Sequence, residues 1–395
     1  MLSSFIAKII KSEKGAIISK PKIEPIISNI LLVMKIALVY DYLNQYGGGE
    51  RVLEIFTAMF PQASLYTIFY DQQKTRQRFN NTTIKTSFLD FKLSRDNHRW
   101  FIPLMPRAIE SLDLGNQYDL IISIGASYAR GISYQAPTKH LHYCFTPLRY
   151  AWEDRYIPPQ IKNFNLLTRP LRNYLKQWDF KVAQKPDKIL TISDYISKRI
   201  RKCYGRSAEI LHPPLNTKIF HLDSHIRKQN YFLAAGRLLH YKKFDLVIKA
   251  FNKLKLPLKI VGQGPEADRL KKLATSPKIE FLGFVKSDDQ MRRIYAGARA
   301  FIFPQVEDFG LVAVEAQACG TPVIAFAQGG ALDIVNHGQN GLLFAQQTPE
   351  CLAYTVKEFS NYKFDAKVIN QSVERFAVRN FKLALVKHLK KLQKS

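Results

Sequence analysis

The sequence predicts an α/β protein built from two consecutive doubly wound units, each a parallel sheet covered by helices on both faces. Two series of short apolar runs alternate with helical patterns along the 395 residues, and this alternation is typical of parallel α/β sheets. Each run is a continuous stretch of Ile, Val, Leu and Phe, as expected for strands that are buried on both faces. The length suits two domains of ordinary size, each with its own core.

The first series opens with the strand predicted at 35–40, KIALVY. A turn of three glycines at 47–49 follows it and leads into an amphipathic helix. The apolar side of this helix consists of Val52, Leu53, Phe56 and Met59. Further strands are predicted at 64–69, 118–125, 139–145 and 187–193, and a helix starts at Asp194.

A polar stretch at 215–230 separates the first series from the second. The second series has strands predicted at 231–237, 258–264, 279–285, 299–304 and 322–326, with helices at 244–254, 265–274, 287–297 and 311–319. The tail carries Phe381, Leu385, Leu389 and Leu392 at helical spacing, which predicts an amphipathic helix packed back on the body. The expected parts are an extension at 1–33, domains at 34–215 and 216–375, and the helix at 376–395.

The first 33 residues differ in character from the rest of the chain, because Met34 stands directly before the first clean strand. We expect either that Met34 is the natural start or that residues 1–33 form a loose extension. The segment lacks the order of charge, apolar core and cleavage site that a secretory signal has. No apolar run in the sequence reaches the roughly 18 to 20 residues that a membrane-spanning helix needs.

The formal net charge of +27 indicates a polyanionic partner, either nucleic acid, an anionic membrane surface or a phosphorylated ligand. No zinc spacing, RNP motif or helix-turn-helix pattern supports nucleic acid, which is therefore not expected as a partner. The four cysteines lie far apart without a CxxC pair. A metal cluster or a disulfide framework is thus not expected, and a reducing, cytoplasmic location fits better.

Two carboxylates near the end of a predicted strand are the first candidates for chemistry. Glu307 lies on the loop after the strand that ends at Pro304, and Glu315 lies about a turn into the next helix. Free N–H groups at a helix start can hold an anion or hydroxyls. A carboxylate can accept two hydrogen bonds from a sugar. The alternative is structural, with Glu307 as a helix cap and Glu315 in a surface ion pair.

Two cations at the end of another predicted strand suit a diphosphate. Arg237 follows the strand at 231–237 and Lys242 precedes the next helix, so a guanidinium fork and a point charge converge there. Such groups would neutralise the charge that develops on a leaving diphosphate. The glycines at 47–49 would let a phosphate or a sugar approach the backbone closely. A solvated basic loop and a plain tight turn are the structural alternatives.

Together these elements resemble the retaining family 4 glycosyltransferases, which have the GT-B fold, and among them the mannosyltransferases of bacterial surface-polysaccharide synthesis. The resemblance runs from about Met34 to the C-terminus. It is carried by GGGER, TISDYISKRIRKCYG, LHPPLNTKIF, AAGRLLHYKKFDLVIKAF, VGQGPE, FLGFV and EDFGLVAVEAQACGTPVIAFAQGGALDIV.

The resemblance implies a role for each matched position. Arg237 and Lys242 would hold the donor diphosphate and Glu307 would contact the donor sugar, so these three are the expected catalytic residues. The expected donor-binding residues are Gly48, Gly49, Gly262, Phe309, Gly310, Leu311 and Glu315. It also implies that the nucleotide sugar is a substrate bound mostly by the C-terminal domain, that no cofactor or metal is required, and that the last helix crosses back to the N-terminal domain.

One position departs from the family. Relatives carry HTPxRYxW where this chain reads FTPLRYAW, so Phe145 stands at the usual histidine. Its ring cannot hydrogen-bond a sugar hydroxyl. The contact is therefore lost, supplied by another residue such as His142, or replaced by aromatic stacking. The residues assigned to the acceptor side are His142, Thr146 and Arg149, with an ordinary strand role as the alternative for His142.

The expected reaction moves a hexose from a nucleoside diphosphate to a hydroxyl of a lipid-linked or polysaccharide acceptor. Retention by double displacement needs a carboxylate below the anomeric carbon. Asp41 and Asp154 are candidates only by position. Front-face attack is favoured instead, with the leaving phosphate accepting the proton. GDP-mannose is the first expectation for the donor, and UDP-hexoses stay open.

Three other functions stay open at this point: a nucleotide-sugar epimerase, a basic nucleic-acid-binding protein and a non-catalytic polymer-binding relative. The basic residues also suggest a peripheral position on the cytoplasmic face of a membrane, because cations beside Trp100 and Phe101 suit anionic lipid headgroups. Scattered solvated lysines are the alternative. These basic residues are Lys74, Arg76, Arg78, Lys85, Lys92, Arg95, Arg99 and Arg107, then Arg169, Arg172, Lys176, Lys181, Lys185 and Lys188.

Overall fold

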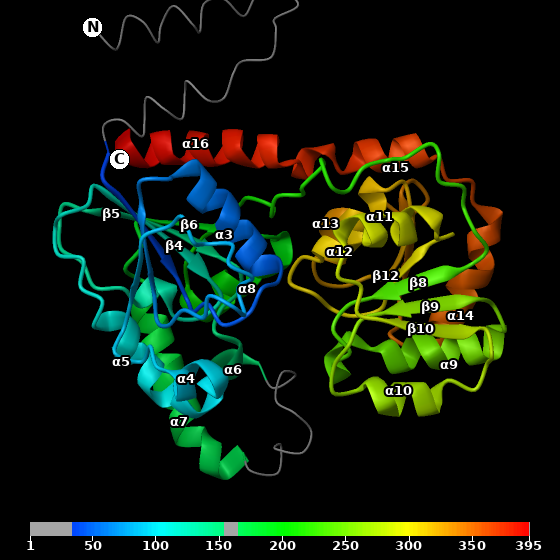
Figure 1. Ribbon diagram of the computed structural model, residues 1–395, viewed down its shortest axis with the longest axis horizontal. Helices are drawn as coiled ribbons and strands as arrows, with labels where there is room; N and C mark the ends of the chain where they lie inside the picture. The colour runs from blue at the N-terminus through cyan, green and yellow to red at the C-terminus, as the bar shows by residue number, and fades with distance from the viewer. Residues whose placement is uncertain (1–33, 154–164, 395) are drawn as a thin grey trace, which may run out of the picture. The chain divides into compact units, whose positions relative to one another are not determined.

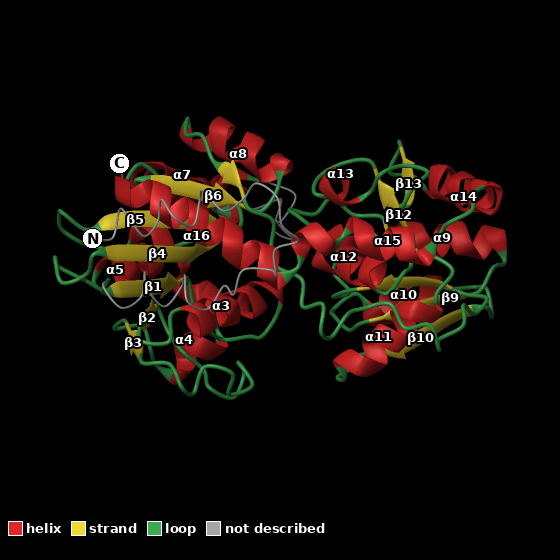
Figure 2. Ribbon diagram, turned by 90° about the horizontal axis from the view of Figure 1, so that it is seen from above, coloured by secondary structure: helices red, strands yellow, loops and turns green. Residues whose placement is uncertain are grey.

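The computed structural model describes residues 34–153 and 165–394 of the protein. Seven parallel strands form one sheet and six parallel strands form a second, and helices cover both faces of each (Figure 1, Figure 2). The predicted class of two doubly wound units is confirmed. The extension predicted at 1–33 lies outside the described residues, and the boundaries predicted at 215/216 and 375/376 stay predictions.

The first sheet has the strand order β3-β2-β1-β4-β5-β6-β7. Its strands are β1 (Ile36–Tyr40), β2 (Ser64–Thr67), β3 (Ile84–Thr86), β4 (Leu120–Gly125), β5 (Lys139–Cys144), β6 (Lys188–Thr191) and β7 (Glu209–Ile210). Every residue of β1 and β4 is buried, which is why these two central strands read as unbroken apolar runs.

Helices cover the two faces of this sheet with separate sets of apolar side chains. They are α3 (Gly48–Met59), α4 (Lys92–Asp96), α5 (Met105–Glu110), α6 (Arg149–Trp152), α7 (Asn165–Val182) and α8 (Asp194–Tyr204), with 3-10 helices η1 (His98–Leu104) and η2 (Ala129–Gly131). Ile109 of α5 and Trp178 of α7 share a core with Val39 of β1. On α3, the predicted apolar side is buried, as its spacing required.

The second sheet has the strand order β10-β9-β8-β11-β12-β13. Its strands are β8 (Phe232–Ala235), β9 (Leu258–Val261), β10 (Ile279–Gly283), β11 (Phe301–Phe303), β12 (Val323–Phe326) and β13 (Gly341–Phe344). Its helices are α9 (Phe244–Leu254), α10 (Ala267–Leu273), α11 (Asp288–Gly297), α12 (Leu311–Ala318), α13 (Ala331–Ile334), α14 (Pro349–Glu358) and α15 (Ala366–Ser372), with η5 (His240–Lys242), η6 (Phe359–Asn361) and η7 (Glu374–Phe376).

Both sheets change the direction of their strand order next to their first strand. In the first sheet β1 lies between β2 and β4, and in the second β8 lies between β9 and β11. Ligands of doubly wound folds bind outside the carboxyl ends of the strands at such a switch point. The loops after β1 and β4, and those after β8 and β11, are therefore the places to look for a site.

The chain passes from the first sheet to the second and then returns. Its last helix, α16 (Val378–Lys394), packs on the first sheet, because the ring of Phe381 lies 5.7 Å from Phe56 of α3 and 5.8 Å from Tyr143 of β5 (Figure 1). The predicted apolar stripe of this helix is buried throughout. Beside it, Leu215 N–H donates to the Phe376 carbonyl at 2.6 Å, so the outgoing and returning segments are hydrogen-bonded to each other.

The structure adds elements that the sequence did not predict. The strands β3, β7 and β13 were not predicted, and neither were α4, α5, α7, α14 and α15. β3 and β7 lie at the edges of the first sheet and are only three and two residues long. So short a segment carries no measurable periodicity, and an edge position does not require apolar residues.

Candidate functional site

Lys242 and Glu307 lie at the switch point of the second sheet and form an ion pair. Lys242 ends η5, which follows β8, and Glu307 lies on the loop after β11. The two side chains are 17% and 19% exposed, so the pair is largely shielded but reachable. Arg237 lies exposed on the same β8 loop. The structure thus brings the predicted lysine and glutamate together, and it leaves Arg237 open to solvent.

The start of α12 depends on a glycine with an unusual backbone conformation. Gly310 has φ of 114°, and a Cβ there would lie 2.6 Å from the ring of Phe303. Only glycine tolerates both the left-handed conformation and this close approach. Phe309 is buried against His212, with ring centroids 5.5 Å apart. Leu311 then begins the helix, so its first N–H groups lie beside the Glu307 loop.

Glu315 is held by groups from both halves of the chain. Its Oε1 accepts a hydrogen bond from Arg51 Nη1 at 3.1 Å, and its Oε2 accepts one from the Tyr295 hydroxyl at 3.2 Å. Arg51 also contacts Asp288 at 3.0 Å. Burial raises the pKa of Glu315 to about 7, while the Arg51 guanidinium and the Tyr295 hydroxyl act to lower that pKa. Glu315 is therefore in a buried ion pair rather than the surface pair weighed from the sequence.

The glycine turn of the first sheet lies against the start of α12. A Cβ at Gly48 would be 3.4 Å from Cδ1 of Leu311. A Cβ at Gly49 would be 2.6 Å from the Tyr40 hydroxyl and 3.2 Å from the ring of Phe145. The turn therefore lies against both the start of α12 and the partly buried ring of Phe145.

Gly262 follows β9 and adjoins the β8 loop. A Cβ at this position would lie 1.9 Å from the carbonyl oxygen of Gly236, the residue before Arg237. The missing side chain lets the two loops touch. Gly262 thus shapes the backbone next to Arg237.

Asp308 links the predicted acceptor-side residues to the loop of Glu307. Arg149 forms an ion pair with Asp308, and Arg199 contacts the same carboxylate at 3.4 Å. Arg199 also donates to the Thr146 hydroxyl at 2.8 Å. The Ser193 hydroxyl donates to the backbone carbonyl of Asp308 at 2.5 Å. The structure thus brings Thr146 and Arg149 close to the Glu307 loop.

Three residues of this arrangement were missed by the sequence analysis: Arg51, Asp308 and Arg199. Arg51 pairs with a residue 264 positions away, and Arg149 with one 159 positions away. The signal that could have identified Arg51 and Asp308 is their adjacency to residues already singled out. No comparable signal existed for Arg199, which lies in the middle of α8.

His142 is not placed to replace the missing histidine of the family. It is 1% exposed, and its Nδ1 lies 2.8 Å from the Ser123 hydroxyl, which also lies 2.7 Å from Nε2 of His140. Burial lowers the pKa of His142, so its ring is neutral. Both histidines are on one face of β5, because residues two apart on a strand point to the same side. The structure therefore supports an ordinary structural role for His142 within the strand.

Asp41 is likewise not placed as a nucleophile. Its carboxylate accepts four backbone hydrogen bonds, from the N–H groups of residues 126 to 129 at 2.7 to 3.0 Å. These bonds hold the loop after β4 and the start of η2 against β1. The other candidate by position, Asp154, lies outside the described residues.

Two absences in the described residues bear on metals and membranes. Residues 34–153 and 165–394 hold no group of three or more His, Cys, Asp or Glu side chains arranged for a metal ion. Within the same ranges, no helix combines the length and the apolar character needed to cross a bilayer.

Comparison with known proteins gives one family match. The model of the family described as glycosyl transferases group 1 matches residues 218–375. An uncharacterised glycosyltransferase of Methanocaldococcus jannaschii is 32% identical over 154 residues, which are 36% of this chain and 39% of that protein. A GDP-mannose-dependent alpha-(1-6)-phosphatidylinositol monomannoside mannosyltransferase of Mycobacterium tuberculosis is 29% identical over 207 residues, 45% of this chain and 54% of that protein. The matched regions span only 36% to 60% of the first three curated relatives.

Solved structures match nearly the whole chain. Sucrose-phosphate synthase from Thermosynechococcus elongatus superposes with a TM-score of 0.70 at 17% identity, covering 91% of this chain and 99% of that one. The Anabaena protein HepE in complex with UDP-glucose gives 0.64 at 17% identity, covering 91% of this chain and 100% of that one. At such identities the likeness concerns the fold alone, and that fold is GT-B.

Proposed function

We propose that this chain, whose residues 218–375 match the group 1 glycosyltransferase family and whose fold is GT-B, transfers a hexose from a nucleoside diphosphate sugar to an acceptor hydroxyl with retention. The observation that carries the proposal is the ion pair of Lys242 with Glu307, from the two loops at the switch point of the second sheet. The usual ligand-binding position of doubly wound folds is this same point.

The positive charges of Arg237 and Lys242 support the binding of the donor diphosphate. Arg237 is exposed, and among the described residues the ion-pair partner of Lys242 is Glu307, so a diphosphate can recruit both cations. The Lys242 ammonium would exchange the carboxylate for phosphate oxygens, and Glu307 would then be free to accept hydrogen bonds from the hexose. Cations beside the bridging and terminal phosphate oxygens stabilise the charge that builds as the glycosidic bond breaks.

Glu315 completes the proposed donor site. Its carboxylate would accept hydrogen bonds from the ribose hydroxyls, replacing the Arg51 contact or adding to it. The glycine turn at 47–49 lies against the start of α12, so a diphosphate bound beside this contact would meet backbone N–H groups of both.

We propose that the acceptor binds on the side of the site where Thr146 and Arg149 lie. Front-face attack fits the surroundings, because Asp41 is engaged by four N–H groups and cannot turn toward an anomeric carbon without giving them up. The acceptor oxygen would attack the face from which the phosphate leaves, and that phosphate would take the proton. The protein then contributes position and electrostatic stabilisation. We propose a lipid-linked or polysaccharide acceptor and a peripheral cytoplasmic location.

GDP-mannose is the first choice of donor. It is supported by the mannosyltransferase relative of Mycobacterium tuberculosis, whose name includes GDP-mannose. UDP-hexoses are the second choice, supported by the UDP-glucose complex of HepE, which has the same fold. The residues assigned to the site contact the sugar, the diphosphate and the ribose, and they do not select a nucleobase.

A thermal-shift experiment on the full chain tests the donor. GDP-mannose, UDP-glucose and ADP-glucose are each titrated, and a ligand that binds only the folded protein raises the melting temperature. We expect one nucleotide class to raise it and the others to have little effect. No shift with any of the three at millimolar concentration would refute donor binding. The anomeric configuration of a product made with the selected donor, read by NMR, then tests retention.

A further inference from the structure

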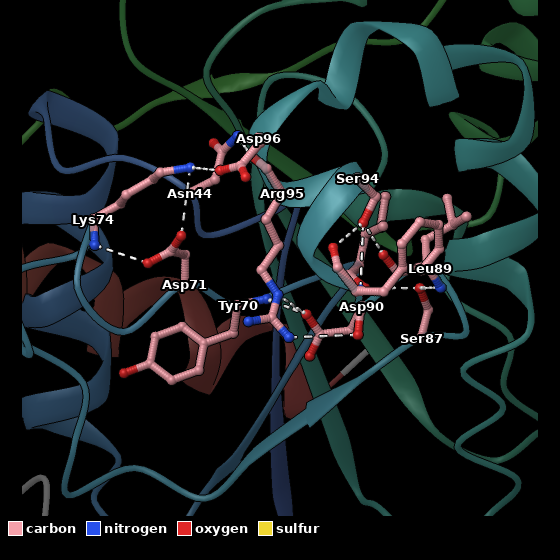
Figure 3. Close-up of polar contacts among 12 residues, drawn as sticks. Asn44, Tyr70, Asp71, Lys74, Ser87, Leu89, Asp90, Ser94, Arg95 and Asp96 are labelled. Carbon is pink, nitrogen blue, oxygen red and sulfur yellow. Dashed lines mark hydrogen bonds and ion pairs between the residues drawn. The ribbon is translucent and has the colours of Figure 1, made fainter.

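Polar contacts hold the segment from Ser87 to Leu104 together and tie it to Lys74 of the preceding loop (Figure 3). The buried Ser94 hydroxyl lies within hydrogen-bond distance of the Leu89 and Phe91 carbonyls. Arg95 Nε donates to Asp90 Oδ1 at 2.7 Å, and Lys74 Nζ donates to Asp96 at 2.5 Å. These contacts hold α4 and η1 in one orientation and so determine which side chains face outward.

The outward side chains of this segment are unusually apolar. Five of the thirteen large apolar side chains exposed in the described residues fall between 88 and 104. They are Phe88, Phe91, Leu93, Trp100 and Leu104, and Trp100 is the most exposed at 71%. The rings of Phe91 and Phe101 are 5.4 Å apart, so α4 and η1 pack together and their exposed residues are neighbours. Such a concentration marks an interaction site.

The charged side chains of this segment that form no ion pair in the described part of the chain are all positive. Lys92, Arg99 and Arg107 are exposed, and none of them has an ion pair among the described residues. The two acids of the segment are already neutralised, Asp90 by Arg95 and Asp96 by Lys74. Some cations predicted for a membrane surface are engaged, because Lys74, Arg78 and Arg95 are in ion pairs. Lys92 and Arg99 belong to the segment that holds the exposed apolar side chains, and Arg107 follows it closely in the sequence.

We propose that this surface, formed by the five apolar side chains and by Lys92, Arg99 and Arg107, docks the protein on an anionic lipid bilayer. Trp and Phe side chains insert at the level of the headgroups, and Lys and Arg beside them attract anionic lipids. An acidic protein would also be attracted by the charge. A bilayer suits the surface better, because an exposed Trp in a segment with exposed cations matches an interface that is apolar below and anionic above.

The surface lies at the same end of the first sheet as the glycine turn. Asn44, three residues before Gly47, donates from Nδ2 to the Arg95 carbonyl at 3.1 Å, and the same group lies 3.1 Å from His98 Nδ1. Docking would therefore bring the bilayer to the loops that precede the proposed site. This inference rests on the proposed function in one respect: a lipid-linked acceptor would give the protein a reason to dock on a bilayer.

The test is cosedimentation of the full chain with large vesicles of phosphatidylcholine containing about 30% phosphatidylglycerol, compared with phosphatidylcholine alone. We expect binding to the anionic vesicles. The charge variant Lys92→Gln/Arg99→Gln/Arg107→Gln should bind roughly 10- to 100-fold more weakly. Its matched control is Lys271→Gln/Lys357→Gln/Lys363→Gln, which removes the same charge from exposed positions of the second domain and should bind nearly as wild type.

The apolar side chains of the surface are tested with the variant Leu93→Ser/Trp100→Ser, which should bind the anionic vesicles about tenfold more weakly. Its matched control is Tyr354→Ser/Val368→Ser, at exposed positions elsewhere. Equal loss in a surface variant and its control would mean general attraction by net charge or hydrophobicity and would overturn the proposal. Wild-type dimers in light scattering that the Leu93/Trp100 variant abolishes, without vesicle binding, would assign the surface to a second copy instead. Circular dichroism and the donor-induced thermal shift of each variant establish folding and keep this test separate from that of the proposed function.

Discussion

Arg51, the residue that follows the glycine turn of the first domain, holds Glu315 of the second domain by a hydrogen bond of 3.1 Å. The guanidinium lowers the pKa of a carboxylate that burial otherwise raises, and the balance is a pKa of about 7. The charge state of a proposed donor-binding group thus depends on a residue from the other half of the molecule. Donor binding and the approach of the two halves should therefore be linked.

We expect the dependence of donor affinity on pH to report this link. The carboxylate is the form that accepts hydrogen bonds from ribose, so donor affinity should fall as the pH drops through about 7. In Arg51→Gln the cation that lowers the pKa is gone, and the acid limb should move to higher pH. The measurement is the donor KM or Kd between about pH 5.5 and 8.5. Arg293→Gln, which removes an exposed arginine from α11, should leave the limb unchanged. An unmoved limb in Arg51→Gln would contradict the assignment.

Glu307→Gln should reduce turnover far more than donor binding. The amide keeps the shape of the side chain but removes the negative charge that strengthens the proposed hydrogen bonds from the hexose to Glu307. We expect kcat to fall roughly 100-fold, which is the effect of losing one well-placed electrostatic group. Steady-state kinetics would measure it, with Glu358→Gln on α14, where the side chain is partly exposed, as the matched control. Unchanged turnover would remove Glu307 from the site.

Arg237→Ala/Lys242→Ala should abolish the donor-induced thermal shift. The two cations carry the proposed diphosphate contact, so binding of the nucleotide sugar and of the free nucleoside diphosphate should be lost together. The melting temperature without ligand should change little, because Arg237 is exposed and the ion pair of Lys242 is partly solvated. Lys271→Ala/Lys272→Ala on α10 serves as the control. A donor shift that survives in the double variant would place the diphosphate elsewhere.

Asp41→Asn should lower the free energy of unfolding, because we expect Asp41 to have a structural role and not to act as a nucleophile. The amide can accept at one oxygen only, so it leaves some of the N–H groups of residues 126–129 without a partner. We expect a loss of roughly 1–3 kcal/mol in the free energy of unfolding, measured by chemical denaturation. The exposed Asp268→Asn should change it by much less. Mass spectrometry of the wild type during turnover should find no glycosyl adduct, and an adduct on Asp41 would restore double displacement.

All strands except β3, β7 and β13, and the helices α3, α8, α9, α10, α11, α12 and α16, could be predicted from the sequence, and the clearest of them have an unambiguous pattern. β1 and β4 are buried on both faces, and α3 and α16 bury a single stripe, so hydrophobic spacing alone identifies them. α12 was predicted at 311–319 from the alternation of apolar strands and helical segments.

The contacts between the two halves could not be predicted. Nothing in the local sequence of Arg51 or Asp308 indicates a partner on another domain, since such pairs depend on how two separately folded sheets meet. The place of His142 was also open, because alternation on a strand shows which residues share a face but not whether that face is reached by a ligand. Its burial beside Ser123 required the structure.

The returning helix α16 makes the first domain discontinuous in the chain. Phe56 and Tyr143 are covered by Phe381, which is separated from β7 by the whole of the second domain. During synthesis the ribosome releases the first sheet long before this cover exists. The nascent first domain therefore presents an apolar patch at the very stage when chaperones bind such patches, and it becomes fully native only after the second domain has been made.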